Sequence, residues 1–439
     1  MKGKICCVLN VILLLAAILA FALRFQPVTA APRMWWVNDD GWANFKTIQE
    51  AVDAASAGDT VYVCNGTYNE AVLVNKSLLI VGESKDSTIV RSSGVMSDVF
   101  NVTATDVFIA NLTIGDGVCG INVLGSRVTI SMCKFSFNSI GAYLQGMNCS
   151  VLDSEFALND VGIDICRSSS NFIMHNRFVQ NNWIGLSLEF DSGSNIVKFN
   201  DVSMNGYSPY FPDILGGIFL FNSENNTLAG NNIVSNKIQV NDRSNKLSSN
   251  VWSEEFPAGG NYWSDYVTKY PNASEIEDSV VWATPYVINT LNVDTFPLMN
   301  PVKAFDALGP DGKSYDVTAS SNSTISGFSF NPDDGPSISF VVAGPSGTTG
   351  SCGIIIPKEL LASESGWYVI IDGETVNHAT IPTESFTYLH FAYNHSIRAV
   401  MIKPEKAVPE FNVLVALLLL MTATALITAV LKRKKAESA

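Results

Sequence analysis

The sequence predicts an all-β protein whose central part winds into a parallel β-helix, because it combines a repeat with period-two alternation and turn residues. An apolar position recurs at steps of 21, 21, 22, 24 and 31 residues, at Ile114, Phe135, Phe156, Phe178, Val202 and Ile233. A second series, glycine followed by an apolar residue, runs in step with it at Gly120, Gly141, Gly162, Gly185 and Gly217. A fixed period above about 20 residues is typical of stacked-repeat folds.

Each repeat unit has the composition of short strands and turns. Runs such as Ile121-Asn122-Val123 and Ile163-Asp164-Ile165 alternate apolar and polar residues, with Asn, Gly and Ser between the runs. Such alternation indicates strands, and three short strands with their turns fill one rung of a β-helix. Leucine-rich repeats share the period and are the alternative fold. They need a leucine framework, whereas the anchors here are Phe, Ile and Val.

The register of the repeat predicts two ladders of side chains. The position before each anchor would form an outward ladder of alternating charge through Thr113, Lys134, Glu155, Arg177, Asp201 and Asn232. Two positions before each anchor, a polar ladder would run through Leu112, Cys133, Ser154, Asn176, Asn200 and Asn231. Stacked amides hydrogen-bond along such an axis. Both ladders are structural features.

Helix and sheet patterns predict what flanks the repeat. Lys46 to Ala55 has apolar residues at helical spacing behind a candidate N-cap, Asn44, and would cover the exposed end of the β-helix, which spans residues 32 to 300. Residues 301 to 403 lose the period and alternate as an antiparallel sheet, which predicts a β-sandwich. Its expected strands are Ser337 to Val342, Trp367 to Ile371, Tyr388 to Tyr393 and Ile397 to Ile402, with a hairpin turn at Asp372-Gly373.

The two ends of the chain predict export and anchoring. Residues 1 to 30 read as a secretory signal peptide. Residues 411 to 431 carry no charge over 21 positions and are followed by a basic tail at 432 to 439, which is typical of a transmembrane helix with a cytoplasmic end. A short stalk, 404 to 410, would join this anchor to the sandwich. The predicted location is the cell surface, as a single-pass membrane protein with an extracellular N-terminal part.

Charge and glycosylation motifs agree with that location. The formal charge is -14, from 27 basic and 41 acidic residues; the terminal segments hold seven of the basic and one of the acidic residues, which leaves the part between them near -20. Such a surface repels phosphate backbones and excludes nucleic acid as a partner. Asn-x-Ser/Thr motifs predict glycosylation at Asn65, Asn75, Asn101, Asn148, Asn225, Asn272, Asn322 and Asn394.

Three segments resemble known families. The run from Trp42 to Ser84 is similar to the opening of right-handed parallel β-helix proteins of the pectate-lyase-like superfamily, and more narrowly of its NosD-like branch, which abounds in archaeal surface proteins. GGNYWSDY, residues 259 to 266, resembles the segment that closes such helices. Residues 344 to 361 and 388 to 402 resemble a module found beside archaeal membrane anchors. The resemblance implies a right-handed helix and a carbohydrate-binding or sugar-hydrolysing role.

The fold that this resemblance implies invites a search for catalytic groups. Lyases of this type need acidic Ca²⁺ ligands beside a base, and hydrolases need paired carboxylates. The candidates are Asp153, Asp160, Asp164 and Arg177, although the charge ladder already accounts for Arg177. Relatives carry an Asp/Gly-rich run near their closing motif, but residues 270 to 283 here contain only three acids, which does not favour a calcium site.

Neither a metal nor a cofactor is predicted. NosD-like proteins are linked to copper, yet the chain has four histidines, and His175 stands alone on its rung. The mature chain's cysteines, Cys64, Cys119, Cys133, Cys149, Cys166 and Cys352, lack zinc-type spacing. Cys119, Cys133, Cys149 and Cys166 fall in four different register columns, which favours buried thiols over disulfides.

Aromatic residues predict a carbohydrate-binding surface. The insertion Gly206 to Leu215 contains Tyr207, Tyr210 and Phe211, and Trp183 lies in the rung before it. Exposed rings suit sugar stacking; alternatively, they pack the loop against the β-helix. The sequence thus predicts a structural, adhesive or carbohydrate-binding surface protein whose partners are polysaccharide or cell-envelope components. A polysaccharide lyase or glycoside hydrolase, or a NosD-like copper-related periplasmic factor, remain the alternatives.

Overall fold

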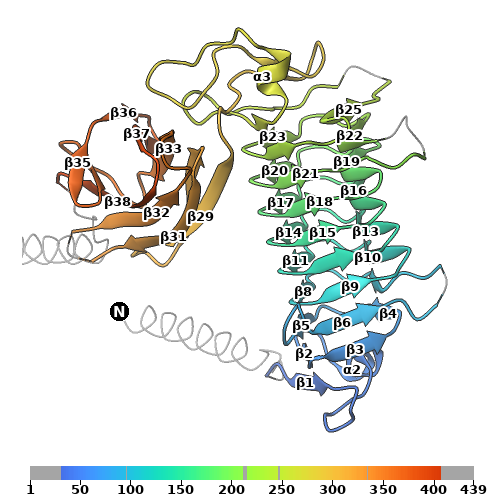
Figure 1. Cartoon of the computed structure of the whole chain (residues 1–439). Helices are drawn as coiled ribbons and strands as arrows, with labels where there is room; N and C mark the ends of the chain where they lie inside the picture. Colours follow the sequence, from blue (N-terminus) through green and yellow to red (C-terminus); the bar gives the residue numbers. More distant parts are fainter. Residues whose placement is uncertain (1–30, 95, 211–214, 246–247, 334, 407–439) are drawn as a thin grey trace, which may run out of the picture.

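The computed structural model describes residues 31–94, 96–210, 215–245, 248–333 and 335–406. They form a long parallel β-helix with a β-sandwich at its side (Figure 1). The predicted signal peptide, most of the stalk, the transmembrane helix and the basic tail lie outside the described residues. Within the described ranges, no helix is both long and apolar enough to cross a bilayer.

Three parallel sheets, here named A, B and C, form the β-helix. Sheet A contains β1 (Met34–Val37), β2 (Thr60–Val63), β5 (Leu79–Gly82), β8 (Phe108–Ala110), β11 (Thr129–Ser131), β14 (Ser150–Leu152), β17 (Phe172–Met174), β20 (Ile196–Lys198) and β23 (Thr227–Ala229). Sheet B contains β3 (Gly66–Asn69), β6 (Thr88–Arg91), β9 (Thr113–Gly115), β12 (Lys134–Ser136), β15 (Glu155–Ala157), β18 (Arg177–Val179), β21 (Asp201–Ser203), β24 (Asn232–Val234) and β26 (Tyr262–Trp263). Sheet C contains β4 (Val72–Val74), β7 (Phe100–Val102), β10 (Cys119–Val123), β13 (Ile140–Leu144), β16 (Val161–Cys166), β19 (Ile184–Glu189), β22 (Gly216–Phe221) and β25 (Val240–Asp242).

The predicted inward column is confirmed. Ile114, Phe135, Phe156 and Phe178 are paired in register from strand to strand and are buried. The ring centroids of Phe135 and Phe156 lie 4.5 Å apart, and those of Phe156 and Phe178 lie 5.0 Å apart, with both ring pairs stacked. Identical neighbours on successive rungs therefore build one continuous core along the axis.

Both predicted ladders are present in the expected register. Arg177 donates to Glu155 at 3.0 Å, whereas Lys134 pairs with Asp86 instead of its ladder neighbour. The buried polar ladder continues as far as Asn261, since each amide donates to the next Oδ1. The structure adds two further ladders at the other corners, formed by Asn138, Asn159, Asn181, Asn205 and Asn236 and by Asn171, Asn195, Asn226, Asn250 and Asn292.

The first end of the β-helix is covered by the predicted helix, α2 (Ile48–Ala54). Asn44 was expected to cap it, and that expectation is wrong. Thr47 is the N-cap residue, and its Oγ1 accepts from the Glu50 N–H at 3.3 Å. Asn44 lies too early in the chain, and its side chain instead accepts from the Trp36 N–H at 3.0 Å.

The closing motif is organised around the buried carboxylate of Asp294. Its Oδ2 accepts from the Asn261 N–H at 2.7 Å and from Trp263 Nε1 at 2.8 Å. A Cβ on Gly260 would lie 1.9 Å from Asp294 Oδ1, which explains a glycine at that position. The short elements of this region are α3 (Tyr266–Lys269), β27 (Tyr286–Val287) and β28 (Val293–Asp294).

The sandwich contains two five-stranded antiparallel sheets. One consists of β29 (Val302–Leu308), β30 (Ser314–Ser321), β33 (Thr349–Pro357), β37 (Phe386–Asn394) and β36 (His378–Pro382). The other consists of β31 (Thr324–Asn331), β32 (Ser337–Ala343), β38 (Ile397–Pro404), β34 (Trp367–Ile371) and β35 (Glu374–Val376). The four expected strands and the turn at Asp372-Gly373, where both φ angles are positive, are confirmed.

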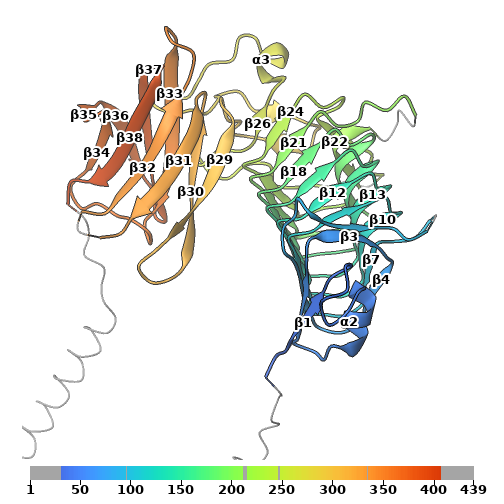
Figure 2. The same cartoon turned by 60° about the horizontal axis from the view of Figure 1, so that its bottom comes forward.

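The two domains are joined by direct contacts. Figure 2 shows β29 beside β24 and β26. There the side chain of Asn232 donates to the Val302 carbonyl and accepts from the Val302 N–H, each at 2.8 Å. Farther along, the hydroxyl of Tyr388 accepts from the Val280 N–H at 3.0 Å. The sandwich therefore packs against the side of the β-helix.

Candidate functional site

The outer face of sheet C is the candidate functional site. From β7 to β22 the flanking apolar residues are buried in the core, so the residue between them points away from the interior, and β25 continues the register. In register, these outward positions form one column of Asn101, Asn122, Tyr143, Asp164, Ser187, Phe219 and Asn241. The column thus combines five polar residues with two aromatic ones along about 30 Å of stacked strands, at about 4.8 Å per strand.

Two carboxylates lie close together on this face. Asp164 pairs in register with Ser187, whose Oγ donates to Glu189 Oε1 at 2.7 Å. Burial raises the pKa of Asp164 to about 7, and the charge of Glu189 adds to the rise. Near neutral pH, Asp164 therefore holds a proton for a substantial part of the time, which equips it to donate as well as to accept hydrogen bonds.

Apolar and aromatic groups flank the carboxylates. Val161, Ile184 and Phe219 form a small hydrophobic cluster of their own, separate from the interior core. Phe190 packs edge-on against Phe221, and the guanidinium of Arg167 lies 5.1 Å from the Phe190 ring centroid. A polar pair beside aromatic rings is the usual composition of a ligand-binding surface.

Several polar atoms on this face lack a partner. The Oδ1 atoms of Asn101, Asn122 and Asp164 are buried and accept no hydrogen bond from the described residues. Buried polar atoms are normally paired with protein groups or with ordered water. Three unpaired acceptors in one column indicate a surface that binds water or ligand hydroxyl groups.

The structure does not bring the four catalytic candidates together. Asp164 lies on the outer face of sheet C, while Asp160 lies at the preceding corner and accepts from Asn182 Nδ2 at 2.9 Å. Arg177 belongs to the sheet B charge ladder. Asp153 faces the sandwich; burial raises its pKa, His175 opposes the rise and Asp306 adds to it. Asp164 has a carboxylate neighbour in Glu189 on the next rung, and Asp153 has one in Asp306 of the sandwich.

That neighbour, Glu189, was missed from the sequence. The repeat predicts its position. The step from Gly162 to Gly185 aligns Glu189 with Cys166 on the rung before, two residues after the aligned pair Asp164 and Ser187. The predicted candidates Asp160 and Asp164 flank the turn glycine Gly162 within one rung. Neighbours on successive rungs carry the pair instead.

The predicted carbohydrate-binding aromatics divide into two groups. Tyr207 and Tyr210 are exposed, at 61% and 70%. Tyr207 lines a pocket of about 690 Å³ beside β25, together with Gln239, Lys269 and Tyr286. Trp183 instead packs with the hydrophobic cluster on sheet C, and Phe211 lies outside the described residues.

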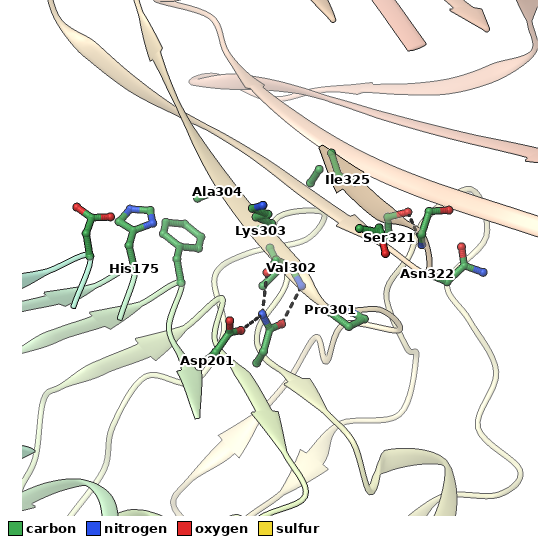
Figure 3. A pocket seen from close by; sticks show the side chains of 15 residues that line it. His175, Asp201, Pro301, Val302, Lys303, Ala304, Ser321, Asn322 and Ile325 are labelled. Atoms are coloured by element: carbon green, nitrogen blue, oxygen red, sulfur yellow. Dashed lines mark hydrogen bonds between the residues drawn. The ribbon is translucent and has the colours of Figure 1, made fainter. Parts of the chain in front are cut away.

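A second concave region separates the β-helix from the sandwich. This interdomain cleft of about 670 Å³ has His175 on one wall and Ser321 and Asn322 on the other (Figure 3). His175 Nε2 lies 3.9 Å from Asp316 Oδ1, and its ring stacks on Phe199. Burial raises the pKa of Asp316, and His175 opposes the rise.

A copper or other metal ion would need several donor side chains that lie close together. Among the described residues, no group of three or more His, Cys, Asp or Glu side chains is placed to hold a metal ion. His175 belongs to the β-helix, whereas His378, His390 and His395 lie in the sandwich. The residues present therefore do not fit a copper site.

The remaining predictions concern cysteines and glycosylation. Cys64, Cys119, Cys133, Cys149, Cys166 and Cys352 are free and buried, as expected. Each predicted glycosylation asparagine is exposed except Asn101, which is half-buried in the outward column of sheet C. Glycosylation itself remains a prediction.

The comparisons with known proteins concern mainly the β-helix. Residues 52–268 match the family model described as "Periplasmic copper-binding protein (NosD)". A cell surface glycoprotein of Methanothermus fervidus is 30% identical over 203 residues, which is 43% of this chain and 33% of that protein. Pectinesterase/pectinesterase inhibitor 18 of Arabidopsis thaliana is 25% identical over 180 residues, covering 39% and 30%. The chain thus spans about a third of these relatives. Pectate lyase Pel9A aligns with a TM-score of 0.44 and 16% identity over 53% of this chain and 70% of its own.

Proposed function

We propose that this chain is a cell-surface protein whose β-helix binds polysaccharide along the outer face of sheet C. The observation that carries the proposal is the outward column with the Asp164 and Glu189 pair, the unpaired oxygens and the flanking rings. The similarity to a protein named cell surface glycoprotein supports the location. A structural or adhesive role follows from such binding.

The chemistry of the face suits sugar rings. Sugars present hydroxyl groups in their ring plane and C–H groups above it, so they need hydrogen-bonding groups beside an aromatic surface. Asn122, Asp164 and Glu189 supply the acceptors, and Phe190 supplies an exposed ring. The pocket lined by Tyr207 lies against β25, at the end of the same sheet, and extends the surface.

Retention of the full chain on a panel of insoluble polysaccharides tests the proposal. Replacing Tyr207 and Tyr210 together by alanine should weaken retention about tenfold, the loss of two ring contacts of about 0.7 kcal/mol each. Phe137→Ala is the matched control, because Phe137 is 64% exposed but lies next to sheet B. Equal retention of the double variant and the wild type would refute binding at this surface.

A second candidate function is hydrolysis of the bound polysaccharide. The specific observation in its favour is the raised pKa of Asp164 beside Glu189, because a glycosidase needs one protonated and one ionised carboxyl group. Incubation with the same panel, with and without Ca²⁺, tests it. New reducing ends that the wild type produces and Asp164→Asn does not would establish hydrolysis. Unsaturated products would establish a lyase. Intact polymer would contradict both activities and leave polysaccharide binding as the function.

A further inference from the structure

A chain of hydrogen-bonded side chains in the sandwich ends at Ser323. Ser323 Oγ lies 2.7 Å from His395 Nε2, and Thr348 Oγ1 lies 2.5 Å from His395 Nδ1 on the opposite side of the ring. The hydroxyl of Tyr393 lies 2.7 Å from Ser323 Oγ. A serine, a histidine that contacts it and a third group that orients the histidine form the arrangement that activates serine nucleophiles.

The hydrogen atoms available on each side chain determine which group donates in each of these hydrogen bonds. Thr348 Oγ1 donates its single hydrogen to the Pro345 carbonyl at 2.7 Å, so it can only accept from His395. Nδ1 of the neutral imidazole therefore carries the proton, and Nε2 presents its lone pair to Ser323. Ser323 consequently donates to Nε2 and accepts from the hydroxyl of Tyr393. This tautomer is the one that a general base for Ser323 requires.

The fold makes room for this arrangement at two glycines. A Cβ on Gly344 would lie 2.4 Å from Cδ2 of His395, and a Cβ on Gly350 would lie 2.2 Å from a ring carbon of Tyr393. His395 is only 6% exposed, which shields the imidazole from water. Both glycines and both rings lie in the two sandwich motifs, residues 344 to 361 and 388 to 402, to which the polysaccharide proposal gives no role.

Ser323 is accessible from the interdomain cleft. It occupies the turn between β30 and β31, is half-buried, and lines the cleft together with Pro301, Val302 and Ile325. These apolar neighbours offer a surface for an acyl group, while the cleft extends as far as Phe199 and His175 on the β-helix. A reactant can thus approach the hydroxyl from the side opposite His395.

We propose that Ser323 is a nucleophile activated by His395 for acyl transfer from carboxylic esters. Ser323 Oγ forms a bond to the ester carbonyl carbon while its proton passes to His395 Nε2. The C–O bond to the alcohol then breaks, and the imidazolium returns the proton to the leaving oxygen. Water then gives a proton to His395 Nε2 and attacks the acyl carbon; the C–Oγ bond breaks, the imidazolium returns the proton to Ser323 Oγ, and the carboxylic acid is released.

The neighbouring groups have distinct parts in this reaction. Thr348 is a positioning residue, since its hydroxyl contacts the imidazole and the Pro345 carbonyl but not Ser323. Tyr393 contacts the reacting oxygen, and its hydroxyl can turn from Ser323 Oγ to the oxyanion that develops on the adjacent carbonyl. The inference is independent of polysaccharide binding, because the cleft lies between the sandwich and the corner that joins sheets A and B, away from the outer face of sheet C.

A fluorophosphonate probe applied to the full-length protein tests the nucleophile, because Ser323 Oγ would displace fluoride and keep the phosphonyl group. Peptide mass spectrometry should find the label on Ser323, and Ser323→Ala should abolish both labelling and p-nitrophenyl acetate hydrolysis. An unlabelled Ser323 in the wild-type protein overturns the proposal.

Substitutions then assign the base. His395→Gln should slow labelling roughly 100-fold, the usual contribution of a general base. Thr348→Val, a milder change that keeps the shape, should slow it less and alter its pH profile. The matched control is Ser351→Ala, since Ser351 Oγ also lies beside a histidine, 3.1 Å from His390 Nε2, and its loss should change nothing. Labelling that persists at the wild-type rate in both His395→Gln and Thr348→Val contradicts activation by His395.

Discussion

Asn159 binds Asn181 twice: its backbone N–H and its Nδ2 both donate to Oδ1 of Asn181, each at 3.1 Å. The same double contact recurs from rung to rung at all three corners of the β-helix. Each amide therefore satisfies a turn N–H that would otherwise be buried without a partner. The stability of the rod depends on these corners as well as on its apolar core.

Replacing Asn181 by alanine should lower the free energy of unfolding by about 3 kcal/mol, because it leaves the Asn159 N–H buried without an acceptor and removes the hydrogen bond from Asn181 Nδ2 to the Phe156 carbonyl. Urea unfolding followed by circular dichroism measures the change. The control is Asn182→Ala at the next residue, whose side chain is exposed and contacts only Asp160, with an expected loss below about 0.5 kcal/mol. Similar losses in both variants would contradict the role given to the ladder.

Gly260→Ala should disrupt the closing segment, since the new methyl group would overlap the Asp294 carboxylate. We expect a loss of about 3 kcal/mol from overpacking, together with faster proteolysis between residues 260 and 300. Gly94→Ala is the control, because the nearest atom to its added Cβ is 3.9 Å away. A Gly260→Ala protein as stable as the control would show that Asp294 does not organise this end.

Arg177→Ala should change little. The pair with Glu155 is solvent-exposed, and exposed ion pairs contribute about 0.5 kcal/mol. Thermal unfolding and polysaccharide retention should both remain near wild-type values. If the variant lost polysaccharide retention while its thermal stability stayed unchanged, Arg177 would instead belong to a binding site on sheet B.

Protonation of Asp164 should raise the free energy of unfolding in mild acid. The pKa of Asp164 is raised from 3.8 to about 7 in the folded chain, so between these values the folded state binds more protons than the unfolded state. Stability from this group therefore increases as the pH falls from 7 to 5, by about 2 kcal/mol. Urea unfolding at both pH values should show this gain in the wild type, reduced by that amount in Asp164→Asn. An identical pH dependence in the two proteins would show that Asp164 is ionised normally.

The sequence was most informative where neighbours on successive rungs are chemically alike. Phe135, Phe156 and Phe178 recur at one period, so the alignment that revealed the repeat also predicted their contact. The Asn138 and Asn171 ladders have the same signal and were overlooked, because the repeat was aligned on its apolar anchors. In the sandwich, strand β30 (Ser314–Ser321) was missed because its Ser and Thr residues lack clear alternation.

The candidate sites were harder to predict, because their residues meet only through register or tertiary packing. Asp164 and Glu189 lie on successive rungs. The interval from Phe178 to Gly185 is longer than that from Phe156 to Gly162, which obscures their alignment in the sequence. Ser323 and His395 are 72 positions apart and lie in two separate turns, each of which connects a strand of one sandwich sheet to a strand of the other. No local pattern in the sequence marks such a contact.

Hydroxyl-radical footprinting of the full chain, with and without a retained polysaccharide, tests the central claim most directly, because it measures the exposure of individual side chains. If polysaccharide binds on the outer face of sheet C, it should protect Phe190, Tyr207 and Tyr210 from oxidation. Phe172 on sheet A and Phe137 near sheet B, which are 43% and 64% exposed, should oxidise equally in both samples. Protection of Phe172 or Phe137 with no change at Phe190, Tyr207 and Tyr210 would contradict binding on this face.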